Sequence, residues 1–209
     1  SQAARASIRS VCGTLTIDTL DGGAWSVEAG SVSGRGPTIR STPGSLSVDA
    51  GVDHDWRWFG DELSRLDVAL PTSRLENLTA ELSFGDGIID LSGADVGRLD
   101  IAANAGRVEL DATSASIGDL AAELNLGSMS IRLPSGSDLT GTLSVNGGEL
   151  TLCSPADVGL RVVTTGSAGE VTVEGRRLDG AVWTSPNQAS ATRIADLTVD
   201  VNLGALRIN

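Results

Sequence analysis

The sequence contains no lysine and no tyrosine, so all of its basic residues are arginine. There are 15 basic and 27 acidic residues, which gives a formal net charge of −12 at pH 7. Proteins bind nucleic acid non-specifically through cationic groups that neutralise phosphates, so this excess of negative charge argues against a nucleic-acid partner. The same sign argues against adhesion to anionic lipid headgroups.

Long apolar runs are also absent. No stretch reaches the roughly 18 apolar residues of a membrane-spanning helix. The first residues, Ser1 to Arg5, lack the hydrophobic segment of a signal peptide. We therefore expect any attachment to a membrane to depend on an anchor that is absent from this chain.

Aromatic residues make up only 3% of the sequence, whereas glycine occurs 26 times. A core without large rings has to be built from Leu, Val, Ile and Ala in a thin layer. Thin apolar layers are typical of stacked β-sheets, and the repeat pattern points the same way.

Five glycines recur at intervals of 21 residues, and each opens a short run in which apolar and other residues alternate. These glycines are Gly85, Gly106, Gly127, Gly148 and Gly169. Four residues after each glycine the position is always aliphatic: Ile89, Leu110, Ile131, Leu152 and Val173. Strict alternation of this kind predicts half-buried β-strands.

A second alternating run begins seven residues before each glycine, as in 78–82, 99–101 and 120–124. Each repeat thus holds two short strands, which cannot bury an apolar face alone, so successive repeats must stack. We predict an all-β fold, a single-stranded parallel β-helix (β-solenoid) of about nine rungs. At about 4.8 Å per rung the stack is roughly 40 Å long.

We expect residues 1–209 to form a single solenoid domain. Residues 1–63 hold irregular early rungs with inserted loops, including the copies that begin at Gly13 and Gly44. Residues 64–175 carry the regular repeats, 176–196 are an insertion, and 197–209 form the final rung.

Asparagine recurs two residues before the repeat glycine, at Asn104, Asn125, Asn146 and Asn202. Both Asn and Gly tolerate left-handed backbone angles, so the Asn-x-Gly pattern predicts the bend between the two strands. Stacked Asn side chains can hydrogen-bond from rung to rung as a ladder. The alternative is a set of independent turns with solvated amides, and we favour the ladder.

The two cysteines fall in different columns of the repeat. Cys12 falls in a column expected to face inward, with Phe84, Ala105 and Leu126. Cys153 falls in an outward column about six rungs away, roughly 29 Å, whereas a disulfide needs Cα atoms within about 7 Å. We predict a buried Cys12 and an exposed free thiol at Cys153. Nothing supports Cys153 as a nucleophile, because the one histidine, His54, lies several rungs away.

One segment combines potential metal ligands with aromatic residues. Its weak candidate ligands are Asp49, Asp53, His54 and Asp55. Its aromatic residues are Trp56, Trp58 and Phe59. Carboxylates and an imidazole can bind a metal, but a single His without a second spaced His or Cys is a weak signal. The rings either cover an open edge of the core or form a partner-binding surface, where Trp is enriched.

We find no catalytic or cofactor-binding motif. The glycines at Gly85 and Gly87 precede a strand rather than a helix, so they do not form a phosphate loop. Acidic pairs such as Glu109 with Asp111 lie outward on a flat sheet, whereas glycosidase carboxylates need a cleft.

The repeats resemble the toast-rack domains, also described as auto-transporter adhesin head-like (GIN-like) domains, of bacterial envelope proteins. The resemblance is carried by 78–91 (LTAELSFGDGIIDL), 99–110 (LDIAANAGRVEL) and 197–208 (LTVDVNLGALRI). It implies a right-handed parallel β-helix with an extracytoplasmic location, as in LiaF-like and phage-shock-protein-C-like proteins. The family has no established catalytic residues to carry over.

These observations favour a non-enzymatic interaction domain of the bacterial cell envelope, acting in stress sensing or adhesion. Its expected partner is a protein or another cell-surface component. A self-assembling structural solenoid is one alternative, since open ends can pair edge to edge. A carbohydrate-active β-helix enzyme is another, and it would need a deep groove with converging carboxylates.

Overall fold

The computed structural model describes residues 4–31, 36–51, 63–165, 169–178 and 182–209. In these residues it contains 15 strands and no helix, which confirms the all-β class. The N-terminal strands are β1 (Ala4–Ser10), β2 (Thr14–Leu20), β3 (Ser26–Ser31), β4 (Thr38–Thr42), β5 (Ser45–Ala50) and β6 (Leu63–Pro71). The central strands are β7 (Leu75–Asp90), β8 (Asp95–Asp111), β9 (Ser116–Arg132) and β10 (Leu139–Cys153). The C-terminal strands are β11 (Val158–Thr164), β12 (Glu170–Val173), β13 (Arg176–Arg177), β14 (Val182–Thr184) and β15 (Arg193–Ile208).

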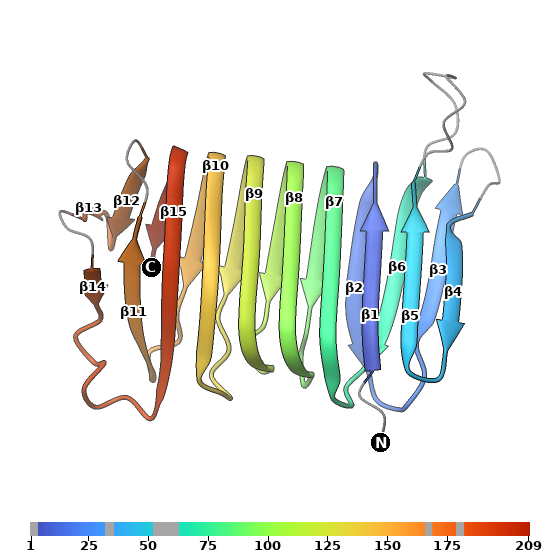
Figure 1. The fold of residues 1–209 in the computed structure, drawn as a ribbon, viewed down its shortest axis with the longest axis horizontal. Coiled ribbons are helices and arrows are strands. Elements are labelled where there is room, and N and C mark those ends of the chain that lie inside the picture. The colour runs from blue at the N-terminus through green and yellow to red at the C-terminus, as the bar shows by residue number, and fades with distance from the viewer. Residues whose placement is uncertain (1–3, 32–35, 52–62, 166–168, 179–181) are drawn as a thin grey trace.

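Each long central strand contains both alternating runs of one predicted repeat. The strands lie parallel with equivalent positions paired, so that Gly85 lies beside Gly106 and Gly106 beside Gly127. In Figure 1 each long ribbon bends near the top of the view and returns behind itself, giving a front and a rear layer. All 15 strands belong to one sheet that is mostly parallel.

The bend depends on glycine. Gly106 has φ +144°, and a Cβ at this position would lie 2.0 Å from the carbonyl oxygen of Gly85 in the neighbouring repeat. Gly127 meets the oxygen of Gly106 in the same way. Because any side chain would both strain the backbone and clash, the repeat retains glycine at this position.

The predicted asparagine ladder is confirmed. The side-chain amide of Asn125 donates to Oδ1 of Asn104 at 2.9 Å, and Asn146 donates to Asn125 at 2.7 Å. Asn202 continues the ladder by donating to Asn146 at 2.9 Å. The ladder therefore joins four successive repeats immediately before the bend.

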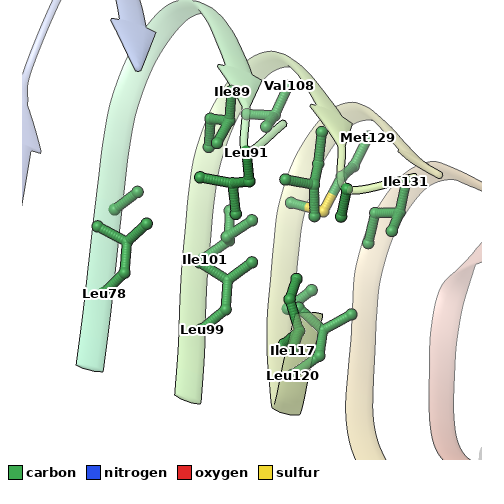
Figure 2. Close-up of a cluster of buried hydrophobic side chains, with 14 of the residues drawn as sticks. Leu78, Ile89, Leu91, Leu99, Ile101, Val108, Ile117, Leu120, Met129 and Ile131 are labelled. Atoms are coloured by element: carbon green, nitrogen blue, oxygen red, sulfur yellow. The ribbon is translucent and has the colours of Figure 1, made fainter. Parts of the chain in front are cut away.

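The core is one thin aliphatic layer between the front and rear layers (Figure 2). The equivalent residues Leu110, Ile131 and Leu152 are all buried and lie on paired strands. This is the arrangement that the alternation predicts.

Order in space differs from order along the chain at both ends. The described strands form eight stacked repeats, in the order β5 with β6, β1 with β2, β7, β8, β9, β10, β15, and β11 with β12. The segment 197–209 is therefore the last repeat along the chain but not the outermost one. As an unbroken strand, β15 pairs along most of β10, whereas β11 and β12 are two short strands that pair on its far side.

The copy that begins at Gly44 was expected to form the half of a repeat that follows the bend, and this prediction was wrong. The copy that begins at Gly44 forms β5, whose Leu46 lies beside Ala6 and thus in the column of Leu78 before the bend. It completes one repeat with β6, which accounts for eight repeats rather than nine. An alternating pattern has the same period in both halves, so alternation alone cannot separate them.

Antiparallel strands cover the outermost repeats. At one end β4 pairs with β5 and β3 with β6, and at the other β14 pairs with β11 and β13 with β12. Trp25 and Trp183 pack against the core at these two ends. Large rings thus close the core where the stack stops.

The column of Cys12 does not face inward. Phe84 and Leu126 in this column are 58% and 61% exposed, and Cys12 itself is half-buried. The prediction was wrong because the bend interrupts the alternation between 82 and 87, so the residue before the glycine points outward. Cys153 is half-buried on an outward face rather than fully exposed, and the two cysteines do not form a disulfide with each other.

Candidate binding surface

A shallow groove of about 430 Å³ crosses the outer face of the front layer, from β7 through β8, β9 and β10 to β15. Its lining comes from equivalent positions in successive repeats: Thr79, Glu81, Asp100, Ile101, Ala102, Ala121, Ala122, Glu123, Thr142, Leu143, Ser144, Thr198 and Asp200. The groove therefore runs along the stacking direction and crosses the strands.

One row of the lining alternates between carboxylates and small side chains. We call it the acidic row; it consists of Glu81, Ala102, Glu123, Ser144 and Asp200, each paired with the next. The residues after the three acids in the chain are buried, so alternation directs the carboxylates outward. Because neighbouring strands lie about 4.8 Å apart, acidic positions recur about every 9.6 Å.

The acidic row does not form a metal site. No group of three or more His, Cys, Asp or Glu side chains in the described residues is arranged to hold a metal ion. The row therefore presents spaced negative charges along a line rather than a converging cluster.

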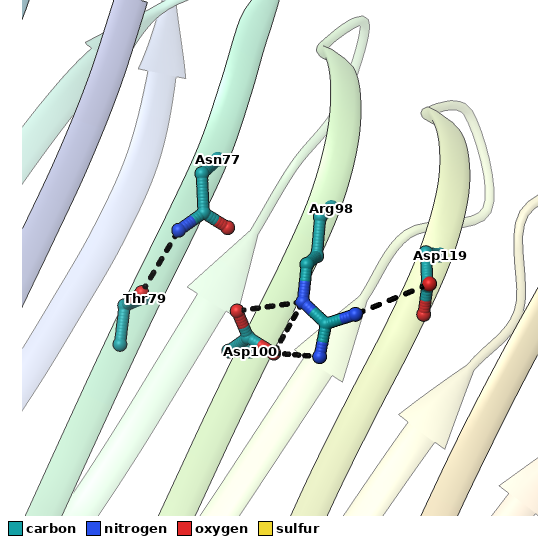
Figure 3. A network of polar contacts seen from close by, with 5 residues as sticks. All are labelled: Asn77, Thr79, Arg98, Asp100 and Asp119. Carbon is teal, nitrogen blue, oxygen red and sulfur yellow. Dashed lines mark hydrogen bonds and ion pairs between the residues drawn. The ribbon is translucent and has the colours of Figure 1, made fainter.

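Thr79, Asp100, Ala121, Thr142 and Thr198 form the second row of the groove. Arg98 lies between Asp100 on its own strand, at 2.8 Å, and Asp119 on β9, at 3.2 Å (Figure 3). The side-chain hydrogen bond to Asp100 and the charges of both carboxylates raise the pKa of Arg98 above its ordinary value. Much of the negative charge of Asp100 is thus offset locally.

The acidic row keeps more of its charge. Glu81 lies 3.9 Å from Arg9 in an exposed pair, whereas Glu123 and Asp200 form no ion pair with another described residue. Exposed pairs contribute little net attraction. The negative potential of the groove consequently comes mainly from these three carboxylates.

Beyond the asparagine ladder lies a row in which exposed large apolar side chains alternate with small residues. We call it the apolar row; it consists of Phe84, Ala105, Leu126, Gly147 and Leu203. Leu203 is 82% exposed and, with Phe84 and Leu126, belongs to the same three repeats that carry the acids. The side chain of Leu126 leans over Gly147, where an added Cβ would lie 3.1 Å from its Cδ2.

Most of the residues predicted to bind a metal or a partner lie outside the described residues. These are Asp53, His54, Asp55, Trp56, Trp58 and Phe59. Asp49 is described: it is exposed on β5, and its Oδ1 accepts a hydrogen bond from the backbone N–H of Gly51 at 2.9 Å. That contact is typical of a turn.

The groove was not predicted from the sequence, and the acidic pair noted there, Glu109 with Asp111, lies on the other half of β8. The alternation of the acidic row is visible once the 21-residue register is written in columns. What the sequence does not show is that the last segment, with Asp200, lies directly beside β10 and completes the row.

Comparison with known proteins supports the fold. No family model matches the chain, and no curated protein matches it. The crystal structure of a "putative cell adhesion protein" from Clostridium sporogenes ATCC 15579 is similar with a TM-score of 0.56 and 14% identity, over 100% of this chain and 92% of that one. A "putative adhesin" from Bacteroides fragilis NCTC 9343 gives a TM-score of 0.30 and 8% identity, over 100% and 93%. The first likeness shows a shared fold.

The described residues contain no helix long and apolar enough to span a membrane.

Proposed function

We propose that this chain is a non-catalytic, adhesin-like binding domain of a bacterial cell-envelope protein, built as a right-handed parallel β-solenoid. The observation that carries the proposal is the groove of spaced carboxylates, hydroxyls and small side chains across five successive repeats. Such a face suits recognition, because it offers many polar contacts along one line and its carboxylates are spaced along that line rather than converging on one point. The fold shared with the "putative cell adhesion protein" supports the same function.

Location follows from this function. A domain that binds a cell-surface protein or polymer acts outside the cytoplasm. We propose an extracytoplasmic domain for which the stacked repeats serve as a rigid spacer and the groove as the contact face. We place residues 1–209 in one such domain.

The proposal is tested by adhesion. Beads coated with the chain are incubated with immobilised peptidoglycan sacculi, collagen, fibronectin and mucin, and bound beads are counted. Ala121→Arg places a large side chain in the groove and is expected to remove most binding, at least about tenfold in retained beads. Ser130→Arg is the matched control, because Ser130 is half-buried on the same strand and faces outward from the rear layer.

Two results would contradict the proposal: no coating material retains the wild-type beads, or the two arginine variants bind equally to whatever material does. Circular dichroism and melting curves of both variants show whether either substitution unfolds the chain. Wild-type levels of folding make the comparison a test of the groove alone.

Self-association is a second candidate function, and the edge strand β4 favours it. All five of its residues are exposed, and among the described strands it pairs with β5 alone. An unpaired, exposed edge can accept a strand from another copy. Size-exclusion chromatography of Ile39→Lys beside wild type tests this: wild-type oligomers that the charged edge abolishes support it, and a wild-type monomer at high concentration contradicts it.

A further inference from the structure

We infer that the groove binds an extended basic peptide in the polyproline II conformation, with a cationic side chain at every third residue, lying along the stack of repeats. This inference rests on the proposed binding function and specifies the chemistry of the partner. Three features carry it: the charge of the acidic row, its period, and the apolar row that repeats in phase with it.

The negative charge of the acidic row favours a cationic partner. Glu123 and Asp200 have no ion pair with another described residue, and Glu81 has only a long exposed contact with Arg9. None of the described residues that line the groove is basic. An anionic polymer would be repelled, whereas arginine or lysine side chains would gain partners along the whole groove.

The spacing of the carboxylates in the acidic row favours one backbone conformation of the bound peptide. Successive carboxylates are separated by about 9.6 Å, twice the strand spacing. Polyproline II has three residues per turn and a rise of about 3.1 Å, so side chains at i, i+3 and i+6 point the same way about 9.3 Å apart. A β-strand repeats a face about every 6.7 Å. An α-helix advances about 5.4 Å per turn and about 10.5 Å per heptad, a mismatch of nearly 2 Å over the row.

Small residues between the acids leave room for the ligand. Ala102 and Ser144 occupy the intermediate positions of the acidic row, and Ala121 lies beside them on the floor. The three-residue turn of a polyproline II peptide therefore rests over short side chains while its cationic residues reach the carboxylates on either side.

The apolar row has the same two-repeat period. Phe84, Leu126 and Leu203 stand on the same strands as the three acids, three residues further along the chain. A polyproline II peptide presents three faces, so one face can carry the cations and the next can carry apolar side chains. Between the rows, Asn125, Asn146 and Asn202 each donate one amide hydrogen to the preceding Asn of the ladder, and the second amide hydrogen can donate to a peptide carbonyl.

Fluorescence anisotropy with two labelled peptides tests the inference. The probe is (Arg-Pro-Leu)4, and the control (Arg-Pro-Arg-Leu-Pro-Leu)2 has the same composition with arginines alternately two and four residues apart. We expect the probe to bind at least about fivefold more tightly than the control, and to weaken as salt rises. Equal dissociation constants for the two peptides would overturn the inference.

Two pairs of variants locate the contact. Glu123→Gln is expected to weaken probe binding about two- to fivefold, as the loss of one exposed ion pair, while Glu109→Gln on the rear layer leaves it within about twofold. Leu126→Ala is expected to weaken binding more than Ile88→Ala, which removes an exposed apolar side chain elsewhere. If Glu123→Gln and Leu126→Ala bind like wild type, the peptide does not occupy this surface.

Two further results separate this inference from the proposed function. If Ala121→Arg abolishes bead adhesion but neither peptide binds the wild type, the groove is the contact face and the basic peptide is not its ligand. If spermine displaces the probe as effectively as unlabelled probe does at equal total charge, the groove recognises polycations without regard to period, and the inference is overturned.

Discussion

At the residue scale, the asparagine ladder shows how one side chain can join neighbouring repeats. Asn125 both accepts from Asn146 and donates to Asn104, so it takes part in two of the ladder's hydrogen bonds. Each net hydrogen bond contributes about 0.5–1.5 kcal/mol to stability. The ladder is consequently a larger contributor at its interior positions than at its ends.

Replacing Asn125 by Ala should therefore cost about 1–2 kcal/mol, which corresponds to a fall in melting temperature of roughly 2–8 °C for a chain of this size. Thr151→Ala is the matched control, because Thr151 is half-buried on an outward face and makes no ladder contact. The measurement is thermal unfolding followed by circular dichroism. Equal melting temperatures for the two variants would show that the ladder does not stabilise the stack.

Asp111 is a second residue whose effect is local and depends on pH. Its Oδ1 accepts hydrogen bonds from the backbone N–H of Thr113 at 3.0 Å and from its hydroxyl at 2.7 Å, and Arg132 lies 3.1 Å from Oδ2. The Thr113 backbone hydrogen bond, followed by the hydroxyl and Arg132, lowers the pKa of Asp111 below its ordinary value of 3.8. The charged carboxylate is thus favoured in the folded chain.

A lowered pKa contributes stability above pH 3.8, where the unfolded chain is also ionised, and this contribution is lost as pH falls toward the folded pKa. We expect Asp111→Asn to lower the urea midpoint at pH 6 and to differ less from wild type at pH 3. Glu109→Gln controls for the change in net charge. A difference between Asp111→Asn and wild type that is the same at both pH values would rule out this origin.

At the scale of the element, each long strand depends on the glycine at its bend. The backbone of Gly106 has a positive φ and lies so close to Gly85 that no Cβ fits. Bending at one residue lets the chain pass from front to rear layer while both halves stay paired with the neighbouring repeat. The pairing of both halves of the strand therefore requires the bend at this glycine.

We expect Gly106→Ala to cost about 3 kcal/mol or more, because it combines an unfavourable φ with a backbone clash. Gly23→Ala is the control, since an added Cβ there has no atom within 4 Å. Chemical unfolding of both variants provides the comparison. Similar midpoints would mean that the stack opens at the bend without appreciable cost.

At the scale of the whole molecule, the features that recur every 21 residues could be predicted from the sequence, whereas features that occur once could not. The 21-residue spacing of glycine and the alternating aliphatic positions were sufficient to predict the stacking of β7 to β10, their common core and the ladder. Alternation could not show that Gly44 begins the first half of a repeat, nor that Phe84 and Leu126 point outward at the bend. Those features depend on backbone geometry at a turn and on long-range pairing, which the local pattern does not encode.

The acidic row illustrates the same limit. Glu81, Ala102 and Glu123 can be aligned from the spacing alone, but Asp200 joins them only because β15 lies beside β10. A residue 56 positions beyond Ser144 therefore completes a row whose other members are 21 apart. Binding surfaces built from stacked repeats are thus only as predictable as the order of stacking.

From the order of the strands in the sheet we also predict how local stability varies along the chain. Strands β1 and β15 lie between other strands, although they come first and last among the described strands, whereas β4 and β13 lie at the edges of the sheet. Amide hydrogen exchange should accordingly be as slow in the paired cores of β1 and β15 as in β8, and fast in β4 and β13. Rapid exchange throughout β15 would contradict its position inside the stack.

The interior position of β15 also affects how the chain folds while it is being synthesised. Among the described strands, β11 pairs with β14 and β15 alone, and β12 with β13 and β15 alone. Both strands are synthesised before β15, their parallel partner, so they cannot pair with it until residues 193–208 have emerged and paired with β10. A nascent chain halted before that point carries an open β10 edge, a surface on which chaperones or proteases can act.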